Sequence, residues 1–288
     1  MKDRGVISVI GRDQKGIVAR ISTYLAAQNI NIEDIEQRVV EGLFIMSMMV
    51  DLTDVSTTLD EVILGLKKIG DEIGVEVKLR LAGDRERKRF AILVTKEPHC
   101  LEALVRDHRL GKLNGDPVIV LSNHDTLGGV AEAAGIPFLW HAADDKAAHE
   151  AFLVDKLRAH RPDLVVLARY MRILTPEFIA RFLNRIINIH PSLLPYHPGA
   201  NAYKQAWEEG VRVSGCTAHF ATAALDQGPV ILQDVFQIRV GEDTLDEVKA
   251  KGRALEGEVL SQAVQLFLND QLIVKDSKVI FKPGRIER

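Results

Sequence analysis

The first 82 residues alternate between short apolar stretches and two amphipathic segments. Apolar residues at Ile17, Val18, Ile21 and Leu25 recur at helical spacing and predict a helix over residues 16–28. A second amphipathic segment predicts a helix over residues 56–69. Extended stretches are predicted at residues 5–10, 30–40, 42–52 and 75–81. The resulting order, βαββαβ, is typical of a small ferredoxin-like sheet covered on one face by two helices.

From Phe90 onward the pattern changes to nearly continuous apolar runs separated by helical segments such as residues 146–160. The runs lie at residues 90–94, 117–121, 136–140, 163–168 and 185–190. Runs of this kind predict strands buried on both faces, and therefore a mostly parallel sheet flanked by helices. Ligands of such Rossmann-like sheets bind at the carboxyl ends of the strands.

A charged segment separates these two patterns. The run GDRERKR has no apolar side chain to bury, which is typical of a linker. We therefore predict a small N-terminal domain over residues 1–83, a linker over 84–89 and a larger domain over 90–288. The predicted fold class is α/β, with one ferredoxin-like and one mostly parallel-sheet domain.

Composition narrows the classes of function. The chain has 47% hydrophobic and 27% charged residues and a formal net charge of -3, so it has no basic surplus for binding nucleic acid or an anionic membrane. No apolar stretch approaches the roughly 18 residues needed to cross a bilayer, and the N-terminus is charged where a secretory signal is apolar. We expect a cytoplasmic protein.

The chain offers little evidence of a metal site. Cys100 and Cys216 lack CxxC spacing and are expected to be buried structural thiols. His99, Cys100 and His124 show no ligand-quality spacing either, so we expect no metal.

The clearest candidate chemistry lies in NIHPSLLP, at the end of the fifth predicted strand of the second domain. Asn188 and His190 are separated by one residue and point to the same face of an extended chain. Pro191 and Pro195 restrict the turn that follows. An amide beside an imidazole can stabilise the oxyanion of a tetrahedral intermediate, although a capped loop with a structural histidine explains the same segment.

A second candidate is Asp226, which precedes Gly228-Pro229 between two strand-like pieces. The glycine-proline pair predicts a turn. An aspartate here can serve catalysis, or it can simply favour the turn through its side-chain oxygen.

Taken together, the motifs Asn-x-His-x-Ser-Leu-Leu-Pro, Thr-x-His-Phe and Asp-x-Gly-Pro resemble those of the folate-dependent formyltransferase superfamily. The resemblance implies that Asn188, His190 and Asp226 are catalytic and that His219 lies near the active site. ARYMRIL resembles the segment that receives the pterin ring, which implies that Met171, Arg172, Ile173 and Leu174 bind folate. Read alone, this segment is a strand end followed by a helix N-cap at Thr175.

Three functions remain: a hydrolase that releases formate, a transferase that formylates glycinamide ribonucleotide, and a sensor without activity. The transferases resembling this chain carry a glycine-rich loop after the first strand of this domain, whose backbone N–H groups bind the acceptor's phosphate. Here residues 95–100 read TKEPHC, with no glycine, a carboxylate and a proline. All three catalytic positions hold the expected residue types, which disfavours an inactive sensor.

The chain is more similar to formyltetrahydrofolate deformylases, and this resemblance covers almost its whole length. Those enzymes begin with an ACT-type regulatory domain of βαββαβ order, and GRDQKGIVARISTYLAAQNINI resembles its start. The resemblance implies an amino-acid effector site at Asp13 and Gly16, or an oligomerisation role through the ACT domains. Two features depart from the deformylase pattern: Pro191 stands where deformylases usually carry a second histidine, and Leu193-Leu194 is more similar to the transferase form than to the phenylalanine-leucine pair common in deformylases.

The resemblance also implies a mechanism, in which water attacks the formyl group of 10-formyltetrahydrofolate without a cofactor. We expect Asn188 and His190 to stabilise the oxyanion and Asp226 to move protons, with its pKa raised by partial desolvation or by nearby negative groups. Asn123 and His124, at another strand end, could position the water or could be structural. Folate, water and an amino-acid effector are the expected partners.

Overall fold

The computed structural model describes residues 3–81, 87–142, 144–196 and 201–283, and it divides into two compact units. One unit comprises residues 1–86 with 281–288, and the other comprises residues 87–280. Residues 84–86 of the predicted linker lie outside the described residues, whereas Lys88 and Arg89, also predicted as linker, already belong to a strand. That strand starts early because its first residues pair with Gly115 and Asp116 of the next strand.

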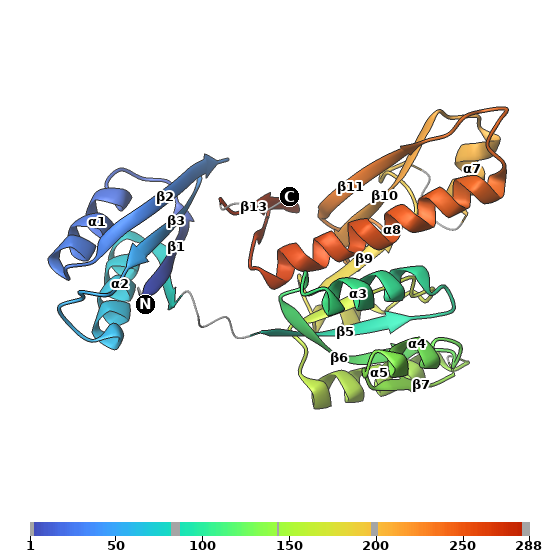
Figure 1. Cartoon of the computed structure of the whole chain (residues 1–288), viewed down its shortest axis with the longest axis horizontal. Helices are drawn as coiled ribbons and strands as arrows, with labels where there is room; N and C mark the ends of the chain where they lie inside the picture. The colour runs from blue at the N-terminus through green and yellow to red at the C-terminus, as the bar shows by residue number, and fades with distance from the viewer. Residues whose placement is uncertain (1–2, 82–86, 143, 197–200, 284–288) are drawn as a thin grey trace. The chain divides into compact units, whose positions relative to one another are not determined.

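The first unit has the predicted βαββαβ order (Figure 1). Its elements are β1 (Arg4–Arg12), α1 (Ile17–Ala27), β2 (Asn31–Val40), β3 (Leu43–Asp51), α2 (Leu59–Ile73) and β4 (Val75–Leu81). The sheet order is β2-β3-β1-β4, and all of its pairings are antiparallel. Ile7 and Val9 of β1 alternate inward and pack with Ile21 and Leu25 of α1, which is why this sheet buries one face under its helices.

The two ends of α2 are set by capping residues, which the spacing of apolar residues does not predict. Thr58 and Glu61 form a reciprocal capping box at its start, which places the helix two or three residues later than predicted. Gly74 ends the helix in the left-handed conformation, with φ 66°.

The second unit contains the remaining elements. They are β5 (Lys88–Val94), α3 (His99–Arg109), β6 (Gly115–Ser122), α4 (Gly128–Ala133), β7 (Phe138–Trp140), α5 (Lys146–His160), β8 (Leu164–Leu167), α6 (Pro176–Ala180), β9 (Ile186–His190), α7 (Ala202–Glu208), β10 (Val213–Phe220), β11 (Val230–Gln237), α8 (Leu245–Leu268), β12 (Leu272–Lys275) and β13 (Lys278–Phe281). Seven strands form one sheet in the order β11-β10-β9-β8-β5-β6-β7, and β12 pairs with β13.

The central sheet is parallel from β9 to β7, while β10 and β11 join it antiparallel. Alternate residues of β5 face opposite layers. Ala91 and Leu93 pack with α5 and α6, whereas α3 and α8 run together along the other face (Figure 1). Burial on both faces explains the continuous apolar runs in the sequence. The fold thus consists of an ACT-type unit and a mostly parallel-sheet unit, as predicted.

The buried sheet makes its apolar side chains the principal source of stability in this unit. Leu121 is 0% exposed in the core of β6, so Leu121→Ala should lower the free energy of unfolding by about 2–5 kcal/mol through the cavity it leaves. Leu110→Ala, at a side chain that is 64% exposed, is the matched control and should change stability by less than about 0.5 kcal/mol. Urea unfolding of both variants measures the difference, and equal effects would contradict the assigned core.

Candidate active site

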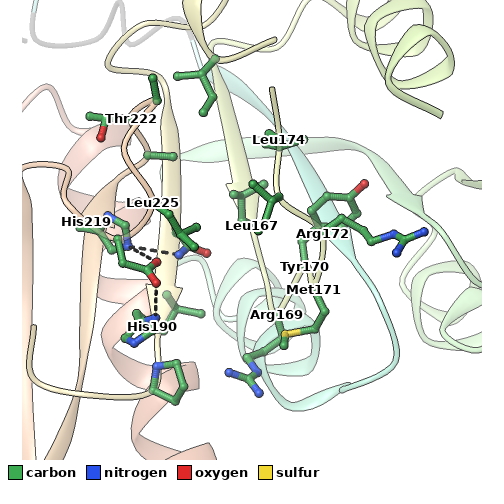
Figure 2. A pocket seen from close by; sticks show the side chains of 18 of the residues that line it. Leu167, Arg169, Tyr170, Met171, Arg172, Leu174, His190, His219, Thr222 and Leu225 are labelled. Carbon is green, nitrogen blue, oxygen red and sulfur yellow. Dashed lines mark hydrogen bonds and ion pairs between the residues drawn. The ribbon is translucent and has the colours of Figure 1, made fainter. Parts of the chain in front are cut away.

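A cavity of about 320 Å³ lies at the carboxyl ends of β8 and β9. Figure 2 shows the loop after β8 on one side and the end of β9 with the loop after β10 on the other. The lining residues include Leu167, Arg169, Tyr170, Met171, Arg172, Ile173, Leu174, Ile179, Asn188, His190, Pro191, His219, Thr222, Leu225 and Asp226. The structure therefore brings together all predicted catalytic residues and all predicted folate-binding residues at one cavity.

The pairing of β9 with β10 places Asn188 directly opposite His219. Asn188 Nδ2 donates to His219 Nε2 at 3.1 Å, and His219 Nδ1–H donates to the carbonyl of Phe220 at 3.0 Å. The second bond fixes the neutral tautomer in which Nε2 is the acceptor. His219 is therefore a buried residue that orients the amide of Asn188.

Asp226 reaches the same place from the loop between β10 and β11. Its Oδ2 lies 3.3 Å from Nδ1 of His190, and its Oδ1 lies 3.8 Å from Nε2 of His219. The aspartate side chain is only 10% exposed. One carboxylate thus lies beside two imidazoles at the border of the cavity.

Gly228 makes this loop possible. A Cβ at this position would stand 1.6 Å from the carbonyl oxygen of Phe220, the same oxygen that accepts from His219. Only glycine allows the two backbones to come this close. The Gly-Pro pair therefore does more than turn the chain, since it presses the Asp226 loop against the strand that carries His219.

The expected raised pKa of Asp226 is wrong for this structure. The hydrogen bond to His190 holds the pKa of Asp226 below its usual value, and this effect exceeds the opposing effect of burial. Neither the burial of Asp226 nor its hydrogen-bond partner can be read from the spacing of residues along the chain. Asp226 is consequently ionised at neutral pH when the cavity holds no substrate.

The loop after β8 forms the opposite wall, and a threonine from another strand end holds it. Thr95 Oγ1 accepts from the backbone N–H of Met171 and donates to Asn123 Oδ1, both at 2.9 Å. Met171 and Ile173 are more than half exposed, an arrangement suited to covering a flat apolar ligand.

Asn123 and His124 do not belong to the described residues that line this cavity. Asn123 is buried in the bond to Thr95, and the backbone N–H of His124 donates to Ser122 Oγ at 3.0 Å. Asn123 thus supports the loop at Met171 from behind. A role for either residue in positioning water stays a prediction.

Asp13 and Gly16 lie in the first unit, between β1 and α1. The N–H of Asp13 donates to the carbonyl of Gly42, and Gly16 begins the helix in the left-handed conformation with φ 92°. An amino-acid effector at these residues, like oligomerisation through the ACT domains, stays a prediction.

Sequence reasoning missed a charged network next to the cavity. Glu256 of α8, whose side chain is 1% exposed, lies 3.1 Å from Nε2 of His99 and 3.4 Å from Nε of Arg169. The motif ARYMRIL contains Arg169, but the sequence predicted no role for it. No residue of α8 was predicted to lie near the site. The sequence carries no signal for this glutamate, because a charged residue in a helix is ordinarily exposed.

The same network contains the nearest approach to a metal site in the described residues. His99, Cys100 and Glu256 offer ligand atoms within 4.8 Å of one another. However, the Arg169 guanidinium lies against the same Glu256 oxygen, and burial beside Glu256 holds the pKa of Cys100 well above its usual value. A neighbouring cation and a protonated thiol both disfavour metal binding.

Comparison with known proteins agrees with this geometry. The formyl transferase family model matches residues 88–264, and the ACT domain model matches residues 4–80. The chain therefore belongs to the formyl transferase family and carries an ACT domain.

Curated relatives narrow the class. Formyltetrahydrofolate deformylase of Escherichia coli (strain K12) is 38% identical over 291 residues, covering 96% of this chain and 98% of the relative. The deformylase of Bacillus subtilis is 36% identical over 284 residues, covering 97% and 94%. The chain belongs to the formyltetrahydrofolate deformylase family.

Solved structures show the same relationship. A formyltetrahydrofolate deformylase from Pseudomonas syringae superposes with a TM-score of 0.88 at 30% identity, over 98% of this chain and 95% of that one. Glycinamide ribonucleotide transformylase 1 from Symbiobacterium toebii reaches a TM-score of 0.66 at 35% identity, over 72% of this chain and 98% of its own.

In the described part of the chain, none of the helices has the length and apolar character needed to cross a bilayer.

The protonation of His219 can be tested by pH titration. Burial lowers the pKa of His219 below the ordinary histidine value of 6.5, so the folded protein favours the neutral ring. Between pH 6.5 and that lower pKa the unfolded chain binds the extra proton, so stability should fall on acidification. His219→Gln, which cannot titrate, should flatten this part of the stability curve in urea unfolding.

NMR titration of the imidazole gives a direct check on the same group. The His219 resonances should shift with a midpoint below 6.5. A midpoint at or above that value would show that the ring is not held neutral by burial.

Proposed function

We propose that this chain hydrolyses 10-formyltetrahydrofolate to formate and tetrahydrofolate. The observation that carries the proposal is the contact of His190 with Asp226 at one end of an apolar cavity, with Asn188 oriented beside them. Formyltetrahydrofolate deformylases from several bacteria match nearly the whole chain, which supports the same reaction.

The cavity suits a flat heterocycle with a short arm. Leu167, Leu174 and Ile179 supply apolar contacts, and the backbone of residues 171–174 supplies N–H and C=O groups to the polar edge of a pterin. Figure 2 shows Leu174 toward one end of the cavity and His190 toward the other. A pterin between the leucines places the formyl arm near Asn188, His190 and Asp226.

Hydrolysis begins when a water oxygen attacks the formyl carbon. The carbonyl electrons move to its oxygen, and the resulting negative charge needs hydrogen-bond donors. The amide of Asn188 has two N–H bonds, of which one donates to His219, and the other serves the oxyanion. His190 completes this donor set through Nε2 when the His190–Asp226 pair holds the proton taken from water, because its Nδ1–H already donates to Asp226.

Asp226 and His190 act as a coupled pair for the proton that water loses. The carboxylate of Asp226 is ionised and borders the cavity, so it accepts this proton as the new C–O bond forms. Filling the cavity with folate removes water around the carboxylate, which strengthens it as a base. When the C–N bond breaks, N10 takes the proton, and formate and tetrahydrofolate leave.

The reaction needs no metal or organic cofactor in this scheme. Every step uses an amide, an imidazole, a carboxylate and water, all of which the chain and solvent supply. Release of formate and tetrahydrofolate balances the one-carbon pool and supplies formate for purine synthesis.

The central test is formate release from 10-formyltetrahydrofolate without any acceptor, measured for the full chain and for Asp226→Asn. The amide keeps the shape of the carboxylate and can still accept from His190, but it cannot take a proton. We expect kcat to fall about 100-fold or more, with folding and folate binding retained.

Asp155→Asn is the matched control, because its side chain is 71% exposed and lies outside the cavity. It should turn over like the unaltered chain. Near-normal turnover of Asp226→Asn would remove Asp226 from the mechanism, and absence of formate release by the unaltered chain would refute the proposed hydrolysis.

A further inference from the structure

Arg169 lies between the catalytic end of the cavity and the segment before α3. It lines the cavity together with His190 and Pro191, and Figure 2 shows it facing the His190 end from the opposite wall. Its Nε also lies 3.4 Å from Glu256 of α8, so the side chain connects the cavity to the helix layer behind it. No step of the mechanism above uses this arginine.

The backbone of Arg169 is held in an uncommon conformation. Its φ is 59°, in the left-handed region that favours glycine, although the residue is an arginine. Such a conformation persists in a non-glycine residue only when the surrounding structure holds it, and it is concentrated at functional sites. Contacts of the Arg169 side chain, and not the loop backbone alone, therefore hold the residue in this conformation.

Glu256 is what holds Arg169. This carboxylate is 1% exposed and needs polar partners, which the Arg169 guanidinium and the His99 ring provide from two different segments. His99 is the first residue of α3, and its Nδ1 lies 3.7 Å from Glu97, which also contacts Arg253 at 3.3 Å. The network therefore fixes Arg169 and brings two carboxylates to the start of α3.

The resemblance to the transferases implies that the phosphate of an acceptor would approach the start of α3, because a helix N-terminus attracts phosphate through its free N–H groups. Here Glu97 lies at that place and contacts Arg253 at 3.3 Å, so this carboxylate competes with a phosphate for the cation. Arg169 connects this place with the cavity, because it lines the cavity with His190 and lies 3.4 Å from Glu256, which contacts His99 at the start of α3.

We propose that Arg169, held by Glu256 and His99, is a specificity-determining residue that closes the acceptor side of the cavity to amines and leaves water as the nucleophile. The inference rests on the proposed hydrolysis and explains why the same fold does not transfer its formyl group. Water is small enough to enter beside the guanidinium, whereas a primary amine on a larger molecule is excluded.

The two outcomes differ only in the nucleophile. In hydrolysis, a water oxygen bonds to the formyl carbon, the C–N10 bond breaks, N10 takes a proton and formate is released. In transfer, an amine nitrogen bonds to the same carbon and loses a proton, the same C–N10 bond breaks, and a formamide is released with tetrahydrofolate. Neither path needs an oxidant or reductant.

The test measures the ratio of formamide to formate made by the full chain from 10-formyltetrahydrofolate with glycinamide or glycinamide ribonucleotide present. Arg169→Gly removes the side chain and suits the positive φ, so the fold should persist. We expect the ratio for at least one acceptor to rise about ten-fold or more. Glu256→Gln removes the charge that holds Arg169 and should raise the ratio by less.

Arg161→Gly is the matched control, because Arg161 is also an arginine at positive φ, 47°, but is exposed at the end of α5. Its ratio should equal that of the unaltered chain. An unchanged ratio in Arg169→Gly overturns the inference, as does loss of both products with folate binding retained, since Arg169 would then serve the chemistry itself. Formate release by the unaltered chain without acceptor tests the hydrolysis separately.

Discussion

The pairing of β10 with β9 is the interaction on which the site depends. It is the point at which the central sheet changes from parallel to antiparallel, and it places His219 opposite Asn188. The same strand then leads into the loop that carries Asp226, pressed back by the close approach of Gly228 to Phe220. Residues that are 38 positions apart in the chain, Asn188 and Asp226, therefore meet at the end of one strand pair.

Much of the fold could be predicted because the apolar pattern is local. Strands such as β8 and β9 are mostly apolar runs, and the polar residues at their carboxyl ends do not contribute to an apolar core, which indicates a site there. Element ends were less predictable. The start of α2 depends on the capping box of Thr58 with Glu61, and β5 extends to Lys88 because of a partner strand.

The members of the site were easier to predict than its electrostatics. The motifs supplied Asn188, His190 and Asp226, but the pKa of Asp226 depends on how close His190 comes, which spacing along the chain does not contain. For the same reason Glu256 was invisible in sequence. A glutamate in a helix is ordinarily solvated, and only the packing of α8 with α3 shows that this one is buried against His99 and Arg169.

The hydroxyl of Thr95 links two parts of the cavity that are otherwise treated as separate. It stands at the start of the TKEPHC segment, yet it accepts from the backbone of Met171 in the loop after β8 and donates to Asn123. Exchange of the whole segment for a glycine-rich phosphate loop would therefore also release the loop after β8, which forms one wall of the cavity. A change of acceptor on this scaffold would have to keep the Thr95 hydroxyl while its neighbours are replaced, because grafting of the whole segment would loosen that wall.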